Sequence, residues 1–371
     1  MILIDKPFDN IEKISQFCNQ CMKEDYIAID TEFIRTSTFF PKVCLIQIAN
    51  SQSAAVIDVL AVKNLKPLLN LLLNKKITKV FHSPKQDLEI FYNLFKKLPN
   101  NIFDTQIAAS FLGLDEQISY EKLVQKFENH KLDKKYQFSN WSKRPLKIEQ
   151  LKYALSDVTF LRKIYSKLVY QLKKRKRLDW TFIESSKFLN INLYRQDPKS
   201  YWQKIRIDMS QGIFLEKLKL LTEWREKKCI KNDITRNLLL SDKKIIKLVC
   251  IKSFKENDLN KIGINKLTLK DKNKILEILN IDDSFLNYNI FIKNKIDKNK
   301  LKLMKTLLKN VSMKEQISAS LIATISDLKK YLINEEGYYP FLNGWRYEIF
   351  GNLIKDNLND NLNLKKIINQ K

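Results

Sequence analysis

The sequence predicts an α/β domain, in which helices cover a mixed sheet, followed by two small all-helical domains. Strand-like and helix-like segments alternate up to about residue 172, and from Leu178 onward short amphipathic helices dominate. The length of 371 residues also exceeds one typical domain. We expect an α/β domain at 1–179, a helical connector at 180–207, and helical domains at 208–289 and 290–371.

Short apolar runs separated by helical segments predict the elements of the first domain. In order, they predict a helix at 11–23, two buried strands joined by a loop within 26–49, a strand at 54–59, a helix at 65–73 and a strand at 77–81. The stretch HSPKQDLEIFYNLF then predicts a helix, with Ser83 as its cap and Pro84 in its first turn. Three strands, a helix, a strand and a helix favour a mixed sheet with helices over it.

The remainder of the chain predicts helices alone. Ser241 and Thr268 are placed to cap the two helices that follow them. Further helical segments are predicted at 214–227, 301–308, 316–332 and 341–358. The tail from Asn357 is rich in Asn and Lys, and we expect it to fray.

The net charge of +26 indicates a polyanionic partner such as nucleic acid. Lysine, asparagine and isoleucine are abundant throughout the chain, and this bias reduces the weight of the charge as evidence. The basic run at 173–177 is either a solvated helix end or a surface that contacts phosphates.

Several features predict a cytoplasmic protein that does not enter a membrane. No apolar run approaches the roughly 18 residues of a membrane span. The first ten residues contain Asp5 and Asp9 and lack the apolar stretch of a signal peptide. The five cysteines are scattered and odd in number, which argues against a disulfide framework.

Two acids interrupt the first apolar strand, YIAIDTEFI. Residues i and i+2 of a strand point to the same face, so Asp30 and Glu32 project side by side. Two adjacent carboxylates repel, and burial increases that cost. Hard divalent cations such as Mg²⁺ and Mn²⁺ bind oxygen ligands and remove the repulsion. The alternative is a strand edge with two solvated acids.

Two further segments carry acids in suggestive places. Asp87 lies one turn into the helix after the strand at 77–81, a common place for a ligand-binding group. Alone, it could be a first-turn acid that stabilises the helix dipole. In EQLKYALSDVTFLRKIY, Tyr153 and Asp157 are four residues apart and share one helix face. Alone, they could be a half-exposed pair at a helix boundary.

Together, D-x-E, Asp87 and Y-x-x-x-D resemble the DEDD-type 3′–5′ exonucleases, and specifically the ribonuclease D family. AIDTEFIRTSTFFPKVCLIQIA, VFHSPKQDLEIF and NWSKRPLKIEQLKYALSDVTFL are similar to its three motifs. A sister subgroup has histidine five residues before the last acid, where this chain has Lys152, so the resemblance is to the tyrosine subgroup. LTEWREKKCIKNDITRNLLLSD and FLNGWRYEIFGNLI resemble paired helicase-and-RNase-D C-terminal (HRDC) domains. The implied fold is ribonuclease H-like.

The resemblance implies a 3′–5′ exoribonuclease that uses two divalent metal ions, Mg²⁺ or Mn²⁺, and releases nucleoside 5′-monophosphates. It implies that Asp30 bridges both ions, that Glu32 and Asp157 complete the first site, and that Asp87 supports the second through water. Tyr153 is expected to orient the attacking water. The expected substrate contacts are Thr31, Phe33 and His82.

The implied partner is RNA, and the implied role is 3′-end maturation of transfer RNA precursors by a monomer. Because the four-acid site alone does not choose between RNA and DNA, a DNA-directed 3′–5′ exonuclease is one alternative. The other is a non-catalytic nucleic-acid-binding scaffold. A helicase component is disfavoured because the sequence contains no G-x-x-x-x-G-K-[ST] loop.

Overall fold

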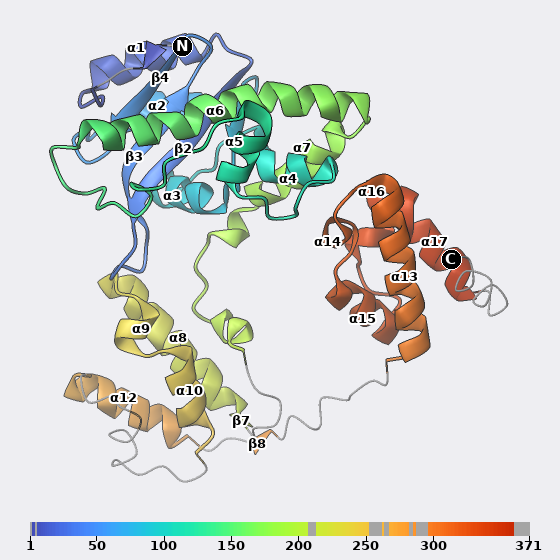
Figure 1. The fold of residues 1–371 in the computed structure, drawn as a ribbon. Helices are drawn as coiled ribbons and strands as arrows, with labels where there is room; N and C mark the ends of the chain where they lie inside the picture. Colours follow the sequence, from blue (N-terminus) through green and yellow to red (C-terminus); the bar gives the residue numbers. More distant parts are fainter. Residues whose placement is uncertain are drawn as a thin grey trace. The chain divides into compact units, whose positions relative to one another are not determined.

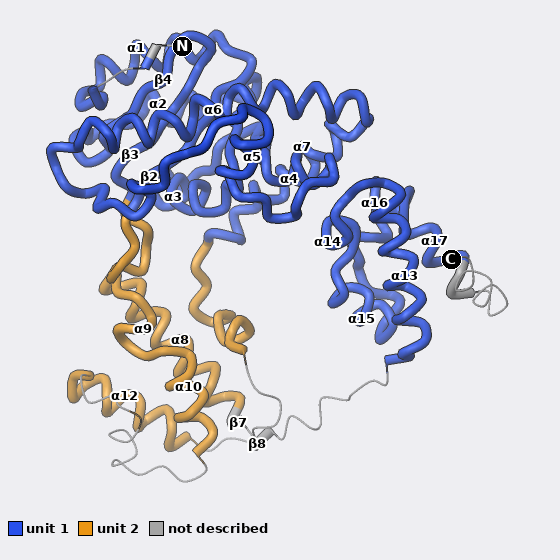
Figure 2. The backbone as a smooth tube through the Cα atoms, viewed as in Figure 1, with its two compact units in different colours: residues 1–33, 43–194, 294–371 blue, residues 34–42, 195–293 orange. Residues whose placement is uncertain are grey.

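The computed structural model describes residues 2–3, 6–206, 213–251, 262, 267–281, 285–286 and 296–359. The chain divides into two compact units (Figure 2). Unit 1 comprises residues 1–33, 43–194 and 294–371, and unit 2 comprises residues 34–42 and 195–293. The short segment 34–42 therefore belongs to unit 2, although it connects two parts of unit 1.

Unit 1 contains a six-stranded mixed sheet, which confirms the predicted α/β class (Figure 1). Its strand order is β1-β4-β3-β2-β5-β6. Strands β2, β5 and β6 are parallel to one another, β1 is parallel to β4, and β4 is antiparallel to β3. The strands are β1 (Ile2–Leu3), β2 (Tyr26–Ile34), β3 (Lys42–Ala49), β4 (Ser53–Asp58), β5 (Thr78–Phe81) and β6 (Ile102–Asp104).

Helices lie against this sheet. Because side chains alternate along β2, the residues of one face of the strand pack against the first three helices. Ile27 and Ile29 belong to a core that also contains Phe17, Leu68 and Phe91 of the first three helices. Alternation directs Asp30 to the opposite face of β2. The helices are α1 (Ile11–Cys21), α2 (Lys66–Leu73), α3 (Lys85–Phe95), α4 (Thr105–Phe111), α5 (Tyr120–Glu128), α6 (Ile148–Lys174) and α7 (Leu178–Ser186). The long helix α6 contacts β4 and β5.

The predicted cap of α3 is wrong, whereas the two caps predicted in unit 2 are confirmed. Ser83 has a positive φ of 57°, and its N–H donates to Asp104 Oδ1 at 2.9 Å instead of its side chain capping the helix. Ser241 and Thr268 do accept backbone hydrogen bonds at the starts of their helices. The hydrogen bond to Asp104 therefore holds the backbone of Ser83 before α3, and the Ser83 side chain makes no cap hydrogen bond.

Unit 2 is helical in its described part, apart from one short antiparallel strand pair, β7 (Ile213–Phe214) with β8 (Phe285–Leu286). Its core includes Phe39 from the segment 34–42, and the Arg236 guanidinium lies 4.7 Å from that ring. The helices are α8 (Leu215–Asn232), α9 (Arg236–Leu239), α10 (Asp242–Val249) and α12 (Leu269–Leu279).

The last part of unit 1 is again helical. The single segment predicted at 316–332 is two helices, because Ala323 and Thr324 are extended and Thr324 caps the second. Among the described helices, none has the length and apolar character needed to cross a bilayer. The helices are α13 (Lys298–Glu315), α14 (Ala319–Ile322), α15 (Ile325–Ile333), α16 (Gly344–Arg346) and α17 (Asn352–Asn359).

The predicted domain boundaries stay predictions. The 207/208 and 289/290 junctions and the tail beyond residue 359 lie outside the described residues. The junction predicted after residue 179 falls within α7, which packs on β6.

A buried ion pair joins α7 to the C-terminal helices within unit 1. Glu184 accepts hydrogen bonds from Arg346 Nη2 at 2.7 Å and from Trp345 Nε1 at 3.1 Å. The Trp345 ring stacks on Trp180 with a centroid distance of 4.9 Å. Arg177 is also buried and pairs with Glu315 of α13, so this member of the 173–177 run is not a solvated phosphate contact.

The first prediction concerns this junction. Glu184→Ala leaves the Arg346 guanidinium buried without its carboxylate, and such a loss destabilises a protein by about 3–5 kcal/mol. Thermal unfolding of the full chain should therefore begin at a lower temperature. The matched control is Lys187→Ala, which removes a mostly exposed partner of the same carboxylate and should cost under about 1 kcal/mol. Equal melting curves for the two variants would show that the buried Glu184–Arg346 pair does not stabilise the protein.

Candidate active site

Three carboxylates from two distant segments converge beside the second half of β2. Asp30 and Glu32 are partly buried on one face of the strand, and Asp157 is buried on α6. One oxygen of each carboxylate lies within 4.8 Å of the others. The structure therefore brings together three of the four acids in a group of the size that holds a metal ion.

Asp87, the fourth acid, lies beside this group in the first turn of α3. Strand β5, which precedes α3, runs parallel to β2, so the carboxyl ends of both strands lie at the same edge of the sheet. Asp87 is buried, and its Oδ1 accepts a hydrogen bond of 2.6 Å from the Thr31 hydroxyl. The Thr31 side chain thus fixes the direction of the Asp87 carboxylate.

Tyr153 lies one helical turn before Asp157 on α6, close enough that, besides burial, the charge of Asp157 helps to raise the pKa of its phenol. The Trp141 ring stacks on it, with a centroid distance of 6.0 Å and an interplanar angle of 30°. Arg144 holds the segment that carries Trp141, because it binds both oxygens of Asp58 at 2.6 Å and donates to the Trp141 carbonyl at 2.7 Å. The position of the tyrosine is therefore set by packing and by an ion pair.

Two buried groups that the sequence patterns did not predict support the site. Tyr120 of α5 donates its hydroxyl to the backbone carbonyl of Asp157. Asp104, at the end of β6, accepts hydrogen bonds from the backbone N–H groups of Ser83 and Gln106. The signal for Asp104 was its place directly between a short apolar strand and a helix, but Tyr120 has no local signature.

Of the other two predicted substrate contacts, His82 has hydrogen-bond partners of its own in the structure. His82 is hydrogen-bonded through Nδ1 to the Thr105 hydroxyl at 3.0 Å and through Nε2 to the Ile118 carbonyl at 3.1 Å. Burial lowers the pKa of its imidazole to about 4. Phe33 is partly exposed near the end of β2. Roles for Thr31, Phe33 and His82 in substrate binding stay predictions.

The pKa values of the four acids are all raised, with burial as the largest cause. Burial raises the pKa of Asp157 to about 8 and that of Asp87 to about 7. For Glu32, burial and the neighbouring carboxylates raise the pKa to about 9. The pKa of Asp30 lies well above its usual range because of burial and the charges of Asp87, Asp157 and Glu32. Without a cation the cluster therefore retains protons at neutral pH.

This donor set fits a divalent metal ion. Carboxylate oxygens are the ligands that Mg²⁺ and Mn²⁺ prefer, and a bound cation favours the charged form of each acid. Asp30, Glu32 and Asp157 are the residues that would hold it, with Asp87 beside them.

The second prediction is the pH dependence of stability in the presence of a chelator. The folded-state pKa values lie above the usual values near 4, so the folded protein binds more protons than the unfolded chain at neutral pH. Stability is thus fully present at low pH and is lost as the pH rises through these pKa values. The melting temperature should fall between about pH 5 and pH 9.

Asp157→Asn is the matched control, because it removes one charge and keeps the side-chain volume. Its melting temperature should fall less over the same range, and Mg²⁺ should raise the wild-type melting temperature more than that of the variant. Parallel curves for the two proteins would contradict the electrostatic account.

Three comparisons agree with this geometry. Residues 6–173 match the model of a family described as 3′-5′ exonuclease. The chain is 37% identical to the ribonuclease D of Bartonella henselae over 341 residues, which cover 88% of this chain and 83% of the relative. It is 35% identical to the ribonuclease D of Sphingobium indicum over 356 residues, which cover 91% and 90%.

A solved structure extends the likeness to the fold. The crystal structure of Escherichia coli RNase D, an exoribonuclease involved in structured RNA processing, aligns with a TM-score of 0.83 at 24% identity. The alignment covers 95% of this chain and 98% of that one. From the motifs, the fold and the two relatives, we conclude that this chain belongs to the ribonuclease D family.

Proposed function

We propose that this chain hydrolyses RNA from the 3′ end and releases nucleoside 5′-monophosphates. The observation that carries the proposal is the convergence of Asp30, Glu32 and Asp157, with Asp87 and Tyr153 at their side. Membership in the ribonuclease D family, whose relatives match over most of their length, supports a 3′–5′ exoribonuclease activity.

The four acids are the residues that would hold two divalent ions. Asp30, whose pKa is raised by burial and by the charges of all three other acids, would contact both ions, while Glu32 and Asp157 would complete one site and Asp87 would support the other. Such ions, when bound, supply the charge that activates a water and stabilises the departing 3′ oxygen. The hydrogen bond from Thr31 keeps the Asp87 carboxylate in place for this task.

Tyr153 positions the attacking water through its hydroxyl. Burial and the charges of Asp157, Glu32 and Asp30 raise the pKa of the phenol, so the hydroxyl stays protonated and acts as a hydrogen-bond donor at working pH. Stacking on Trp141 limits the motion of the ring. A fixed donor beside the cluster orients a water toward a phosphate without giving up its own proton.

The choice of RNA over DNA rests on family membership and on the helical parts, which we take as HRDC-like domains. The charge of +26 favours a polyanionic substrate. We further propose transfer RNA precursors as the physiological substrate, the cytoplasm as the compartment and the monomer as the active form. A DNA-directed exonuclease and a non-catalytic scaffold remain the alternatives that an experiment separates.

The third prediction tests the proposed function. Wild-type protein with Mg²⁺ should release 5′-mononucleotides from a 5′-labelled transfer RNA precursor, and a matched DNA oligomer should be cut more slowly. Asp30→Ala should abolish release yet keep the fold, because it removes charge repulsion from the buried cluster. A chelator should stop cleavage and leave binding intact. Normal digestion by the Asp30→Ala variant would overturn the proposal.

The fourth prediction concerns the tyrosine. Tyr153→Phe keeps the ring that stacks on Trp141 and removes only the hydroxyl, so kcat should fall about 100-fold while KM changes little. Tyr170→Phe, at an exposed position on the same helix, is the matched control and should behave as wild type. Steady-state kinetics on a single-stranded RNA measures both. A tenfold rise in KM with unchanged kcat would assign Tyr153 to substrate binding instead.

A further inference from the structure

Three adjoining hollows lead from Tyr153 across the surface of unit 1. The first, of about 400 Å³, is lined by Tyr153 and by residues of the segment 130–136. It shares Leu132 and Asp133 with a second hollow of about 430 Å³. The second in turn shares Glu121 and Lys131 with a third, of about 590 Å³. Because consecutive hollows share lining residues, they adjoin one another in a series that begins at Tyr153.

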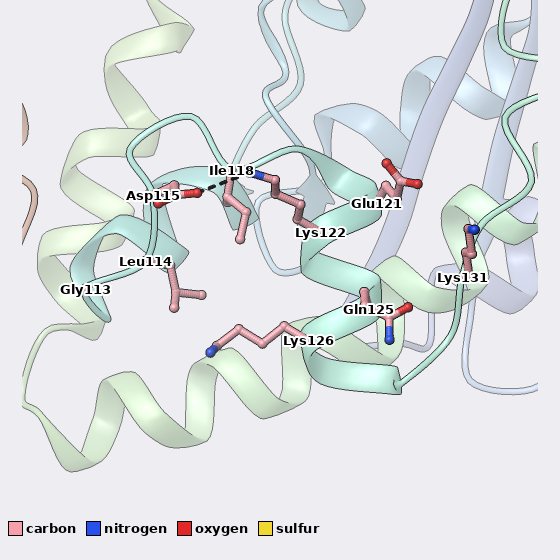
Figure 3. A pocket seen from close by; sticks show the side chains of 9 residues that line it. All are labelled: Gly113, Leu114, Asp115, Ile118, Glu121, Lys122, Gln125, Lys126 and Lys131. Atoms are coloured by element: carbon pink, nitrogen blue, oxygen red, sulfur yellow. Dashed lines mark hydrogen bonds and ion pairs between the residues drawn. The ribbon is translucent and has the colours of Figure 1, made fainter.

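The third hollow lies beside α5 (Figure 3). Leu114 and Ile118 form its apolar floor, and Lys122 and Lys126 border it from α5. Figure 3 shows Lys131 on the chain segment that follows the helix, across α5 from Leu114. Small apolar surface bordered by flexible cations suits a ligand that alternates a flat base with a charged phosphate.

Six lysines and four acids line the three hollows, which leaves an excess of two positive charges along the path. Asp115 pairs with Lys122 at 3.5 Å, and Glu121 pairs with Lys134 at 2.5 Å. Asp133 accepts the backbone N–H of Lys135 at 2.9 Å. The two ion pairs leave four lysines against the charges of Asp133 and Glu149, so the path stays positive overall.

Three exposed lysines mark the length of the path. Lys152 lines the hollow at Tyr153, Lys131 lies where the second and third hollows meet, and Lys126 lies in the third. Within the part of the chain that the structure describes, none of the three makes an ion pair. We call these three residues the lysine path.

Aromatic side chains accompany the lysines at the end nearest the active site. Tyr136 lines the first hollow and is partly exposed. His130 lines the same hollow and stacks on Phe160 with a centroid distance of 4.7 Å. Exposed rings beside cations are the combination that binds single-stranded nucleic acid with little sequence preference.

We propose that the lysine path holds the single-stranded RNA upstream of the nucleotide being removed, with its phosphates on Lys152, Lys131 and Lys126 and a base on Tyr136. This proposal rests on the proposed function, because the path leads away from the cluster that cuts the 3′ end. A strand held in this way would advance by one nucleotide after each cut without any base being read.

The test is the double variant Lys126→Gln/Lys131→Gln, assayed on a long single-stranded RNA and on an RNA dinucleotide. The dinucleotide is too short to reach the third hollow, so the ratio of kcat/KM for the long RNA to that for the dinucleotide should fall about tenfold. The matched control is Lys75→Gln/Lys76→Gln. It removes two exposed lysines that directly precede β5, at the other end of the sheet from the acids, and should keep the wild-type ratio.

A second readout keeps the proposal separate from the proposed function. Binding of the long RNA to the Asp30→Ala protein, with and without the double variant, is measured by fluorescence anisotropy at several salt concentrations. Loss of two phosphate contacts should make the slope of log affinity against log salt smaller by about 1.4 for a single strand. An unchanged ratio or an unchanged slope would overturn the lysine path. Absence of mononucleotide release from wild type, with the slope still reduced, would instead overturn only the proposed function.

Discussion

The mutual repulsion of carboxylates in one partly buried cluster is the constraint on which the site depends. The side chains of Asp30 and Glu32 lie side by side, because the alternation of β2 places both on one face of the strand. Asp157 joins them from α6. Burial raises the pKa values of all three, and the neighbouring carboxylates raise those of Asp30 and Glu32 further. Protons or cations must occupy such a cluster, and a protein that binds divalent ions there gains both charge balance and a hydrolytic site.

The surrounding fold keeps these acids together against their repulsion. Asp87 is held by Thr31, and Tyr153 is held by Trp141. The pair of Arg144 with Asp58 ties the segment before α6 to the end of β4. Each support comes from a different part of the chain, so the geometry of the site depends on the whole sheet having formed. Preorganisation of this kind is what allows donors and acceptors to act without rearrangement during the reaction.

Local pattern was sufficient to predict much of the fold and the identity of the acids. The mixed sheet, the helix that carries Asp157 and the caps at Ser241 and Thr268 follow from periodicity and side-chain chemistry. The failures depend on contacts that are distant in sequence. Ser83 does not cap α3, because Asp104, 21 residues later, binds its backbone N–H.

Contacts between residues distant in sequence, or elements too short for a pattern, also explain the other features that were not predicted. The basic run at 173–177 predicts a solvated helix end or a phosphate contact, and residues 173–176 are exposed, but Arg177 is buried and pairs with Glu315, 138 residues further along the chain. Tyr120 supports Asp157 through a backbone carbonyl, a contact that no motif encodes. The two short strands at the sheet edges, β1 and β6, comprise two and three residues and are too short for a periodic signal.

The most direct test of the account is a calorimetric titration of the metal-free protein with Mn²⁺ at pH 7, repeated in buffers of different ionisation enthalpy. Because Asp157 and Glu32 retain protons at that pH, binding must displace them, and the protein should take up two ions with release of protons to the buffer. Binding that releases no protons, or that is unaffected by Asp157→Asn, would mean that the acids of β2 and α6 do not share a cation.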